Sequence, residues 1–496
     1  MKNTKKLAFG FLSSALLLAL TSCGGNDPVA SSNSEGGTNP VSTASSEESK
    51  IANPWWSTTG ELEKDSSGNV VFEDVDIALT TIVNGDDKAT LEELVSKFNT
   101  EYKNKIHVEV TVAHQGIFDE TVAKQISENS NPPDLIMGHQ KSYKYFTDSK
   151  LLQPFNEAIE KSGISISLDD YSSSLSQYAS MGYDGYTFGV PIDAQSCVVY
   201  YNKSLLAKYG GTLPTGHSSL VELCKKVATG EKITPIAMST EDDFFTNYVF
   251  TTALVQNGAT LYNDSYHATW YDDATNRAAF TNGIASLREL TSSSLAQFGL
   301  GSQTALNQFL GNKALFYIAC PWDLGSLISA VAQKNGVTEE AAKSQFLGAT
   351  SLSNWFALDE ASANANKVFG DSHFFAMSNS VKNIEKKAAI CEFVKWFTST
   401  SSVGTEWAAA GHASASTLVS NSDEYSSNDI VENYVSNYYA DINSFECTGV
   451  MPYYTILRSS LTSLFVSVKT GSASKDADYI KSAQDSMNSQ IDFAEM

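Results

Sequence analysis

Cysteine is scarce in this chain of 496 residues, and no two cysteines have the C-x-x-C spacing. Six are present, and five of them lie beyond the N-terminal region: Cys197, Cys224, Cys320, Cys391 and Cys447. Their odd number and wide separation fit neither a disulfide framework nor a zinc site. We expect buried thiols, with one isolated disulfide as the open alternative for a protein outside the cell.

Common catalytic motifs are absent as well. The chain contains neither H-E-x-x-H nor G-x-S-x-G, the patterns of zinc proteases and of many serine hydrolases. Because these motifs are absent, the sequence predicts no enzyme activity, no metal site and no cofactor. An exported glycan hydrolase is a lower-ranked alternative, because carboxylates that could form acid–base pairs are abundant. The histidines of the chain are dispersed and more typical of surface or hydrogen-bonded side chains: His107, His114, His139, His217, His267, His373 and His412.

Positive charge is in short supply. Lys and Arg number 33 against 56 Asp and Glu, which gives a formal net charge of −23. Such a chain repels phosphate backbones and anionic lipid surfaces. Nucleic acid is therefore excluded as a favourable partner.

No apolar run is long enough for a transmembrane helix. The longest, residues 7–20, falls short of the ~20 residues that a span requires. It follows three lysines, and two small residues separate it from Cys23. This arrangement resembles the lipobox of bacterial lipoproteins, in which the cysteine is acylated and becomes the mature N-terminus. We expect a signal peptide over residues 1–22 and anchoring of Cys23 to the extracellular face of the cytoplasmic membrane. An ordinary signal peptide is the alternative.

The segment after Cys23 is almost entirely small or polar up to residue 50. It cannot bury enough apolar surface to offset the entropy of ordering, so we predict a flexible tether over residues 23–53. About 440 residues remain, which suggests two or more domains.

Hydrophobic periodicity changes repeatedly in the part of the chain that follows the tether. Alternating apolar residues predict strands over residues 75–80 and 106–112, and the short apolar run at residues 134–137 predicts a third strand. Between them, a 3.6-residue period predicts helices over residues 91–102 and 118–126. This βαβαβ order indicates a parallel sheet with helices on its faces, the α/β class.

Ligands of such sheets bind beyond the carboxyl ends of the strands. The loops expected there are residues 84–87, 114–117 and 138–141. Further along the chain, the pattern predicts a buried strand over residues 314–319 and amphipathic helices over residues 390–397 and 480–491.

Residues 191–208, PIDAQSCVVYYNKSLLAK, resemble the signature of the family 1 extracellular solute-binding proteins. Four further segments agree in order and spacing: residues 84–86, 133–136, 311–322 and 393–398. The resemblance covers about residues 74–496 and is greatest to sugar-binding, maltose-binding-protein-like members.

This resemblance implies two α/β lobes joined by crossing strands, with a ligand cleft between them. The first lobe would comprise residues 74–191 and 376–418, and the second residues 192–375 and 419–496. Hinges are expected near residues 191–195, 374–377 and 417–422. The implied function is capture of a carbohydrate by a monomer, with delivery to an ABC-type importer by hinge closure.

Several candidate ligand contacts follow from the same resemblance. Trp322 would stack on a sugar ring, with Asp323 beside it, although Trp322 could instead be a core aromatic. Asn84 and Asp86 would grip hydroxyl groups, and helix capping is a role compatible with that. Planar acids and amides suit sugars because they donate or accept hydrogen bonds in pairs.

Other positions match the pattern less closely. Gln195 falls where a ligand-binding glutamate is expected, with Asp193 nearby. Asp242 and Phe244 match an acid and a tyrosine that touch sugar, but a solvated loop explains them equally well. The family's stacking tryptophan is replaced by Gly138, which leaves the polar candidates His139, Gln140 and Lys141. Tyr453 and Tyr454 are candidates to replace a second lost ring, unless they pack in the core.

Two alternatives to a sugar-binding protein stay open, one with the same fold and another ligand, and one without a ligand cleft. The same fold could carry glycerol phosphate, a polyamine or a peptide. An adhesive or structural surface lipoprotein would instead lack a closing cleft.

Overall fold

The computed structural model describes residues 51–496 except 241–244, 292–293, 298–299, 354–362 and 437–444. Three of the expected functional residues, Cys23, Asp242 and Phe244, lie outside the described residues. Among the described residues, no helix is both long and apolar enough to cross a membrane.

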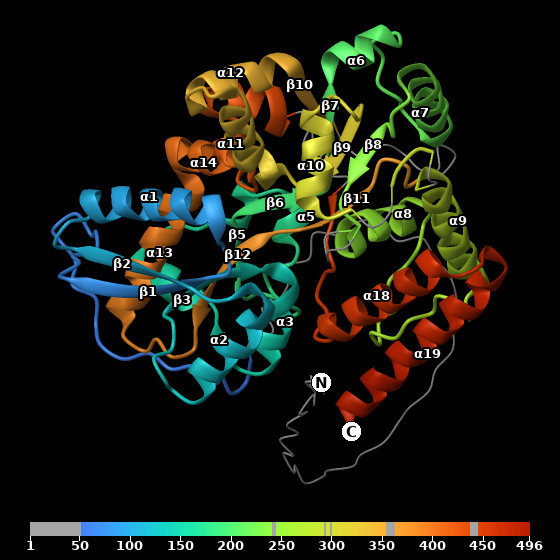
Figure 1. Ribbon diagram of the computed structural model, residues 1–496. Coiled ribbons are helices and arrows are strands. Elements are labelled where there is room, and N and C mark those ends of the chain that lie inside the picture. Colours follow the sequence, from blue (N-terminus) through green and yellow to red (C-terminus); the bar gives the residue numbers. More distant parts are fainter. Residues whose placement is uncertain (1–50, 241–244, 292–293, 298–299, 354–362, 437–444) are drawn as a thin grey trace, which may run out of the picture. The chain divides into compact units, whose positions relative to one another are not determined.

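The first sheet contains the predicted βαβαβ unit (Figure 1). Its strand order is β2-β1-β3-β12-β4, and β5 pairs with β12. β1 pairs in parallel with both β2 and β3, whereas β12 returns antiparallel to β3. The predicted parallel sheet is therefore confirmed for its first three strands. The strands are β1 (Val75–Thr81), β2 (Ile106–Val112), β3 (Leu135–His139), β4 (Leu152–Gln153), β5 (Val190–Pro191) and β12 (His373–Ser378).

The helices of this part of the chain follow the predicted order. α1 begins one residue after Asn84, whose side chain forms no capping hydrogen bond, and its buried face is the one that the periodicity predicts. They are α1 (Gly85–Glu101), α2 (Phe118–Ser127) after the 3-10 turn η1 (Gln115–Ile117), α3 (Gln140–Asp148), α4 (Asn156–Ser162), α5 (Ser173–Ser176) after η2 (Leu168–Asp170), α13 (Ile384–Ser399) and α14 (Ser401–Ala409).

The expected loop at residues 138–141 is wrong. β3 continues through His139, which pairs with His373, and α3 begins directly at Gln140. The backbone amide of Gln140 donates to the backbone carbonyl of Ser372 at 2.8 Å. Because β12 pairs with β3 from a distant part of the sequence, the strand persists where local polarity suggested a loop.

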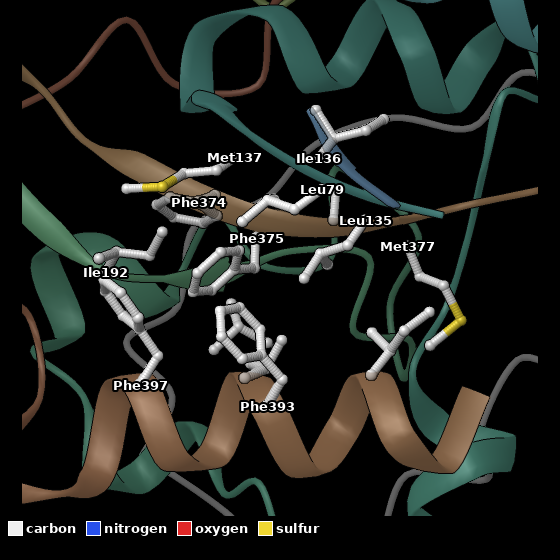
Figure 2. Packing of buried hydrophobic residues seen from close by; sticks show 14 of the residues in the cluster. Leu79, Leu135, Ile136, Met137, Ile192, Phe374, Phe375, Met377, Phe393 and Phe397 are labelled. Carbon is white, nitrogen blue, oxygen red and sulfur yellow. The ribbon is translucent and has the colours of Figure 1, made fainter. Parts of the chain in front are cut away.

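One core is built from two distant stretches of sequence, residues 75–194 and 374–415. Figure 2 shows Phe393 and Phe397 of α13 pointing from that helix toward strand residues such as Leu135 and Phe375. α13 was expected to be amphipathic, but most of its side chains are buried, including Lys387. It packs between the sheet and neighbouring helices, so it has little solvent face.

The second sheet has the order β10-β7-β9-β8. The predicted strand before Trp322 is confirmed as β9, and every residue of it is buried. The strands are β7 (Val198–Asn202), β8 (Ile236–Met238), β9 (Phe316–Ala319) and β10 (Thr350–Ser353).

Most of the remaining helices contribute to two further core clusters, which use residues 197–491. The predicted C-terminal helix is confirmed as α19, which packs on α18. The helices are α6 (Lys203–Lys208), α7 (His217–Glu231), α8 (Thr251–Gln256) after the π-helical turn η3 (Phe245–Phe250), α9 (Ala274–Leu290), α10 (Ser302–Leu310), α11 (Leu324–Asn335) after η4 (Pro321–Asp323), α12 (Glu339–Ala349), α15 (Thr417–Ser420), α16 (Asp423–Ser427), η5 (Val431–Val435), α18 (Tyr454–Thr470), η7 (Ala473–Lys475) and α19 (Asp476–Glu495).

A third, small sheet has the order β13-β6-β11-β14. β6 (Asp193–Ser196) pairs with β13 (Ala413–Ser414) on one side and with β11 (Val368–Asp371) on the other, and β14 is Phe445–Glu446. β6 and β11 directly adjoin strands of the larger sheets in sequence. The small sheet therefore collects the segments where the chain passes from one core to another.

The folded body begins before residue 74, where the resemblance places its start. The Trp55 indole donates to the Leu152 carbonyl at 2.8 Å and stacks on Phe188. Trp56 contacts Phe188 edge-on. Cys197, Cys224, Cys320 and Cys391 are buried free thiols, as expected, whereas free Cys447 is half-buried.

Candidate functional site

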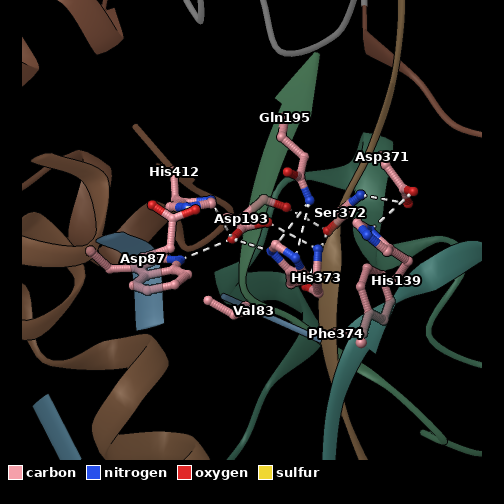
Figure 3. A network of polar contacts seen from close by, with 12 residues as sticks. Val83, Asp87, His139, Asp193, Gln195, Asp371, Ser372, His373, Phe374 and His412 are labelled. Atoms are coloured by element: carbon pink, nitrogen blue, oxygen red, sulfur yellow. Dashed lines mark hydrogen bonds and ion pairs between the residues drawn. The ribbon is translucent and has the colours of Figure 1, made fainter. Parts of the chain in front are cut away.

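A buried polar network lies where the small sheet meets β12 (Figure 3). Its centre is Asp193 of β6, whose side chain is fully buried. The His373 backbone amide donates to Asp193 Oδ1 at 2.9 Å, and His373 Nδ1 lies 2.9 Å from Oδ2. The Trp407 indole also donates to Oδ2 at 2.9 Å. Burial alone would raise the pKa of Asp193, but His373 and His412 outweigh it and hold the pKa well below its usual value.

His412 lies between two carboxylates. Its Nδ1 is 3.3 Å from Asp193 Oδ2, and its Nε2 is 3.2 Å from Asp87 Oδ2 on α1. Burial lowers the pKa of His412, but the two carboxylates outweigh this effect and raise it to about 10. Without another cation at this position, the ring is therefore charged at neutral pH.

A second group surrounds Asp371 at the end of β11. Lys141 Nζ lies 2.5 Å from Asp371 Oδ2, and His139 Nδ1 lies 3.1 Å from it. Burial opposes the charge of Asp371, but Lys141 and His139 hold its pKa well below the usual value. Burial lowers the pKa of His139 to about 4, so this ring is neutral. His139 stacks on His373 with centroids 4.9 Å apart, which joins the two groups.

Aromatic rings border this network. His412 stacks on Trp407 at 4.3 Å and lies nearly parallel to Trp322 at 6.5 Å. Trp322 also meets Tyr248 edge-on, with ring centroids 6.2 Å apart. The Lys141 ammonium lies 4.8 Å from the centre of the Tyr454 ring. Half-buried Trp322 therefore joins a polar centre to a partly aromatic rim.

The local fold fixes the position of Trp322. It lies in η4, directly after buried β9, and Asp323 Oδ2 accepts a hydrogen bond from the Cys320 amide at 3.0 Å. The Tyr200 hydroxyl lies 3.2 Å from the carbonyl oxygens of both Cys320 and Pro321. These contacts hold the turn from two sides.

The structure brings together five of the predicted site residues. His139 and Lys141 surround Asp371, Asp193 and Gln195 meet at His373, and Trp322 faces His412.

Other predicted residues are tied to different partners. Gln140 is fully buried and donates to the Gly449 carbonyl at 3.0 Å. Tyr453 contacts Tyr266 and Glu495. Asn84 is exposed at the start of α1, and Asp86 lies in the first turn of that helix.

Sequence reasoning missed Asp87, Asp371 and Trp407, and it treated His373 and His412 as unrelated. The partners of Asp193 at positions 373 and 407 are 180 and 214 residues away. No local pattern connects such distant positions. Asp87 was within reach of prediction, because it lies next to a predicted site residue and inside the segment 84–87 that was expected at the ligand-binding edge of the sheet.

The family model described as bacterial extracellular solute-binding protein matches residues 93–433, which is more than half of the chain. The protein therefore belongs to the bacterial extracellular solute-binding proteins. A comparison with curated proteins gave no match.

Solved structures share the fold, which is the two-lobed binding-protein fold that the resemblance implied. The GacH receptor of Streptomyces glaucescens GLA.O, solved unliganded and with acarbose, aligns with a TM-score of 0.67 at 16% identity, over 84% of this chain and 99% of its own. Maltose-bound MalE3 of T. maritima aligns with a TM-score of 0.64 at 16% identity, over 85% and 100%. The ABC substrate-binding protein Lmo0181 of Listeria monocytogenes, in complex with cycloalternan, aligns with a TM-score of 0.60 at 16% identity, over 85% and 99%.

Proposed function

We propose that this solute-binding protein captures a carbohydrate of oligosaccharide size and delivers it to an ABC-type importer. Its structural relatives are described with acarbose, maltose and cycloalternan. The observation that carries the proposal is the position of Trp322. This half-buried ring lies beside a network of planar acids, amides and imidazoles. Sugars present apolar ring faces to aromatic side chains and hydroxyl groups to planar polar ones.

The charge of the site favours a neutral ligand. Lys141 is paired with Asp371, so its charge is already compensated before a phosphate could bind. Asp193 and Asp323 already accept hydrogen bonds from the protein. Glycerol phosphate and polyamine ligands would need these charges to be available. A neutral carbohydrate needs none of these charges, because apolar ring faces and hydroxyl groups are what it offers to the protein.

The proposed binding groups come from both halves of the chain. Asn84, Asp86, His139, Gln140 and Lys141 belong to the proposed first lobe, residues 74–191 and 376–418. The proposed second lobe, residues 192–375 and 419–496, contributes the remaining candidates: Asp193, Gln195, Asp242, Phe244, Trp322, Asp323 and Tyr453. Ligand contacts from both lobes favour the closed arrangement, which a permease can recognise as a shape.

We further propose that Cys23 carries the lipid that holds the protein at the outer face of the cytoplasmic membrane, as a monomer. The lipobox-like sequence supports this location. The bound ligand is released unchanged, because no catalytic step is part of the proposal. Turnover of any member of a glycan panel by the purified protein would contradict it.

Binding to a panel of monosaccharides and oligosaccharides tests the function. Because a ligand that binds only the folded state raises its stability, a thermal-shift screen identifies the ligand, and calorimetry then gives its Kd. Trp322→Ala should weaken binding by about thirtyfold, the loss typical of a central stacked ring worth about 2 kcal/mol.

Trp56→Ala is the matched control. Trp56 is also half-buried, but it packs on Tyr186 and Phe188 away from the network. Its loss should lower stability and leave Kd unchanged. Equal losses of affinity in both variants, or no carbohydrate binding by the wild type, would overturn the proposal.

A further inference from the structure

Three metal-ligating side chains meet at the centre of the network, and each comes from a different segment. Asp193 lies on β6, His373 begins β12, and His412 precedes β13. One ligand atom of each lies within 4.8 Å of the others, and all three side chains are buried. Two imidazoles and one carboxylate are a ligand set typical of zinc and of other divalent transition metals.

The orientation of His412 is the second observation. Its ring is 1% exposed, yet neither nitrogen makes a hydrogen bond of good geometry. Buried polar nitrogens normally have a hydrogen-bond partner or a metal ligand role, so the two nitrogens of this ring indicate a further binding partner. The Asp87 carboxylate next to Nε2 provides what metal-bound histidines commonly have, a carboxylate that orients the ring from the far side.

The charges around His412 also favour a bound cation. Asp87 and Asp193 bring two negative charges to the ring of His412. One imidazolium can compensate only one of them. A divalent cation held by neutral imidazoles compensates both charges, of which that of Asp193 is fully buried.

We propose that Asp193, His373 and His412 bind a divalent transition-metal ion of the zinc type, with Asp87 as the carboxylate that positions His412. The rings would bind the metal through deprotonated nitrogens, so metal binding is coupled to proton release to solvent. Calcium and magnesium fit poorly, because they prefer a shell of oxygen ligands.

The consequence is structural. The metal joins the three segments through which the chain passes between its cores, namely β6, β12 and the segment before β13. The metal would stabilise the junction of these three segments, whether or not the transported ligand is a sugar.

Metal content of the full-length protein tests the site. After treatment with a chelator, the protein is incubated with Zn²⁺ either folded or during refolding from urea, so that slow entry into a buried site is detected. We expect about one ion per chain and a higher melting temperature. Co²⁺ in its place should give the intense visible absorption of a four-coordinate site, in which a water completes the three protein ligands.

Three variants assign the ion. His373→Gln should abolish the stoichiometric binding, and Asp87→Asn, which keeps all three ligands, should weaken it by about 10–100-fold. The control is His267→Gln, since His267 forms a surface ion pair with Asp492 and should not affect binding.

If His373→Gln does not fold, the cobalt spectrum of the wild type and the metal affinity of Asp87→Asn still test the site. Substoichiometric uptake by the wild type after refolding, without the cobalt bands, would overturn the proposal. Equal loss of binding in His267→Gln and Asp87→Asn would also overturn it.

Discussion

The close approach of Gly411 to the turn that carries Trp322 gives a sharp prediction. Gly411 has φ +106°, in the region that favours glycine. A Cβ at this position would lie 2.5 Å from the Pro321 carbonyl oxygen and 2.7 Å from the Trp322 amide nitrogen. Both neighbours are backbone atoms, so neither can rotate away. Gly411→Ala therefore pushes apart two backbone segments that are in contact, the one that carries His412 and the turn that carries Trp322.

The size of the effect follows from two contributions. Ordinary contact begins at 3.4 Å, so the two segments must separate by about 0.9 Å. Backbone strain at a positive φ costs on the order of 1–3 kcal/mol, and overpacking adds a similar amount. We expect Gly411→Ala to lower the free energy of unfolding by about 3 kcal/mol or more. Moving Trp322 away from the network should also weaken carbohydrate binding by about tenfold.

Gly336→Ala separates strain from crowding. Gly336 ends α11 at φ +65°, and an added Cβ there meets no atom within 4 Å. This control should lose only about 1 kcal/mol and keep its affinity. Urea unfolding gives the stabilities, and calorimetry with the carbohydrate identified by the screen gives Kd. Two alanine variants that unfold at the same urea concentration and bind equally well would contradict a steric clash between Gly411→Ala and the Trp322 turn.

The remaining predictions concern the second charged group and the membrane anchor. Asp371→Asn removes the ion-pair partner of the largely buried Lys141 ammonium, so it should cost about 3 kcal/mol in urea unfolding. The double variant with Lys141→Met should recover part of this loss, and no recovery would mean that the pair is not coupled. Cys23→Ala should release the protein from the membrane fraction in detergent partitioning without changing its melting temperature, because acyl chains supply the anchoring. A Cys23→Ala protein that stays in the detergent phase would contradict lipidation.

Local signals in the sequence predict much of the first sheet. β1, α1, β2, α2 and β3 each carry their own periodicity, and a βαβ unit allows essentially one handedness of connection. Prediction fails where a distant segment decides the outcome. β3 extends to His139 because β12 pairs with it, and α13 lacks a polar face because it is covered on several sides.

The candidate site divides in the same way. Trp322, Asp193 and Gln195 are identifiable because short motifs surround them. The network that fixes them depends on Asp371, His373 and His412, whose short neighbouring sequences carry no signal of a shared centre. Burial creates their strong interactions, and burial at a junction of three segments is a property of the folded chain.

Small-angle scattering of the purified protein, with and without a saturating carbohydrate from the screen, tests the central claim most directly. If the chain captures its ligand between two lobes that close around it, the radius of gyration should decrease on binding. The decrease should disappear in Trp322→Ala at the same carbohydrate concentration. An unchanged radius of gyration, with calorimetry showing the wild-type site to be saturated, would contradict capture by closure.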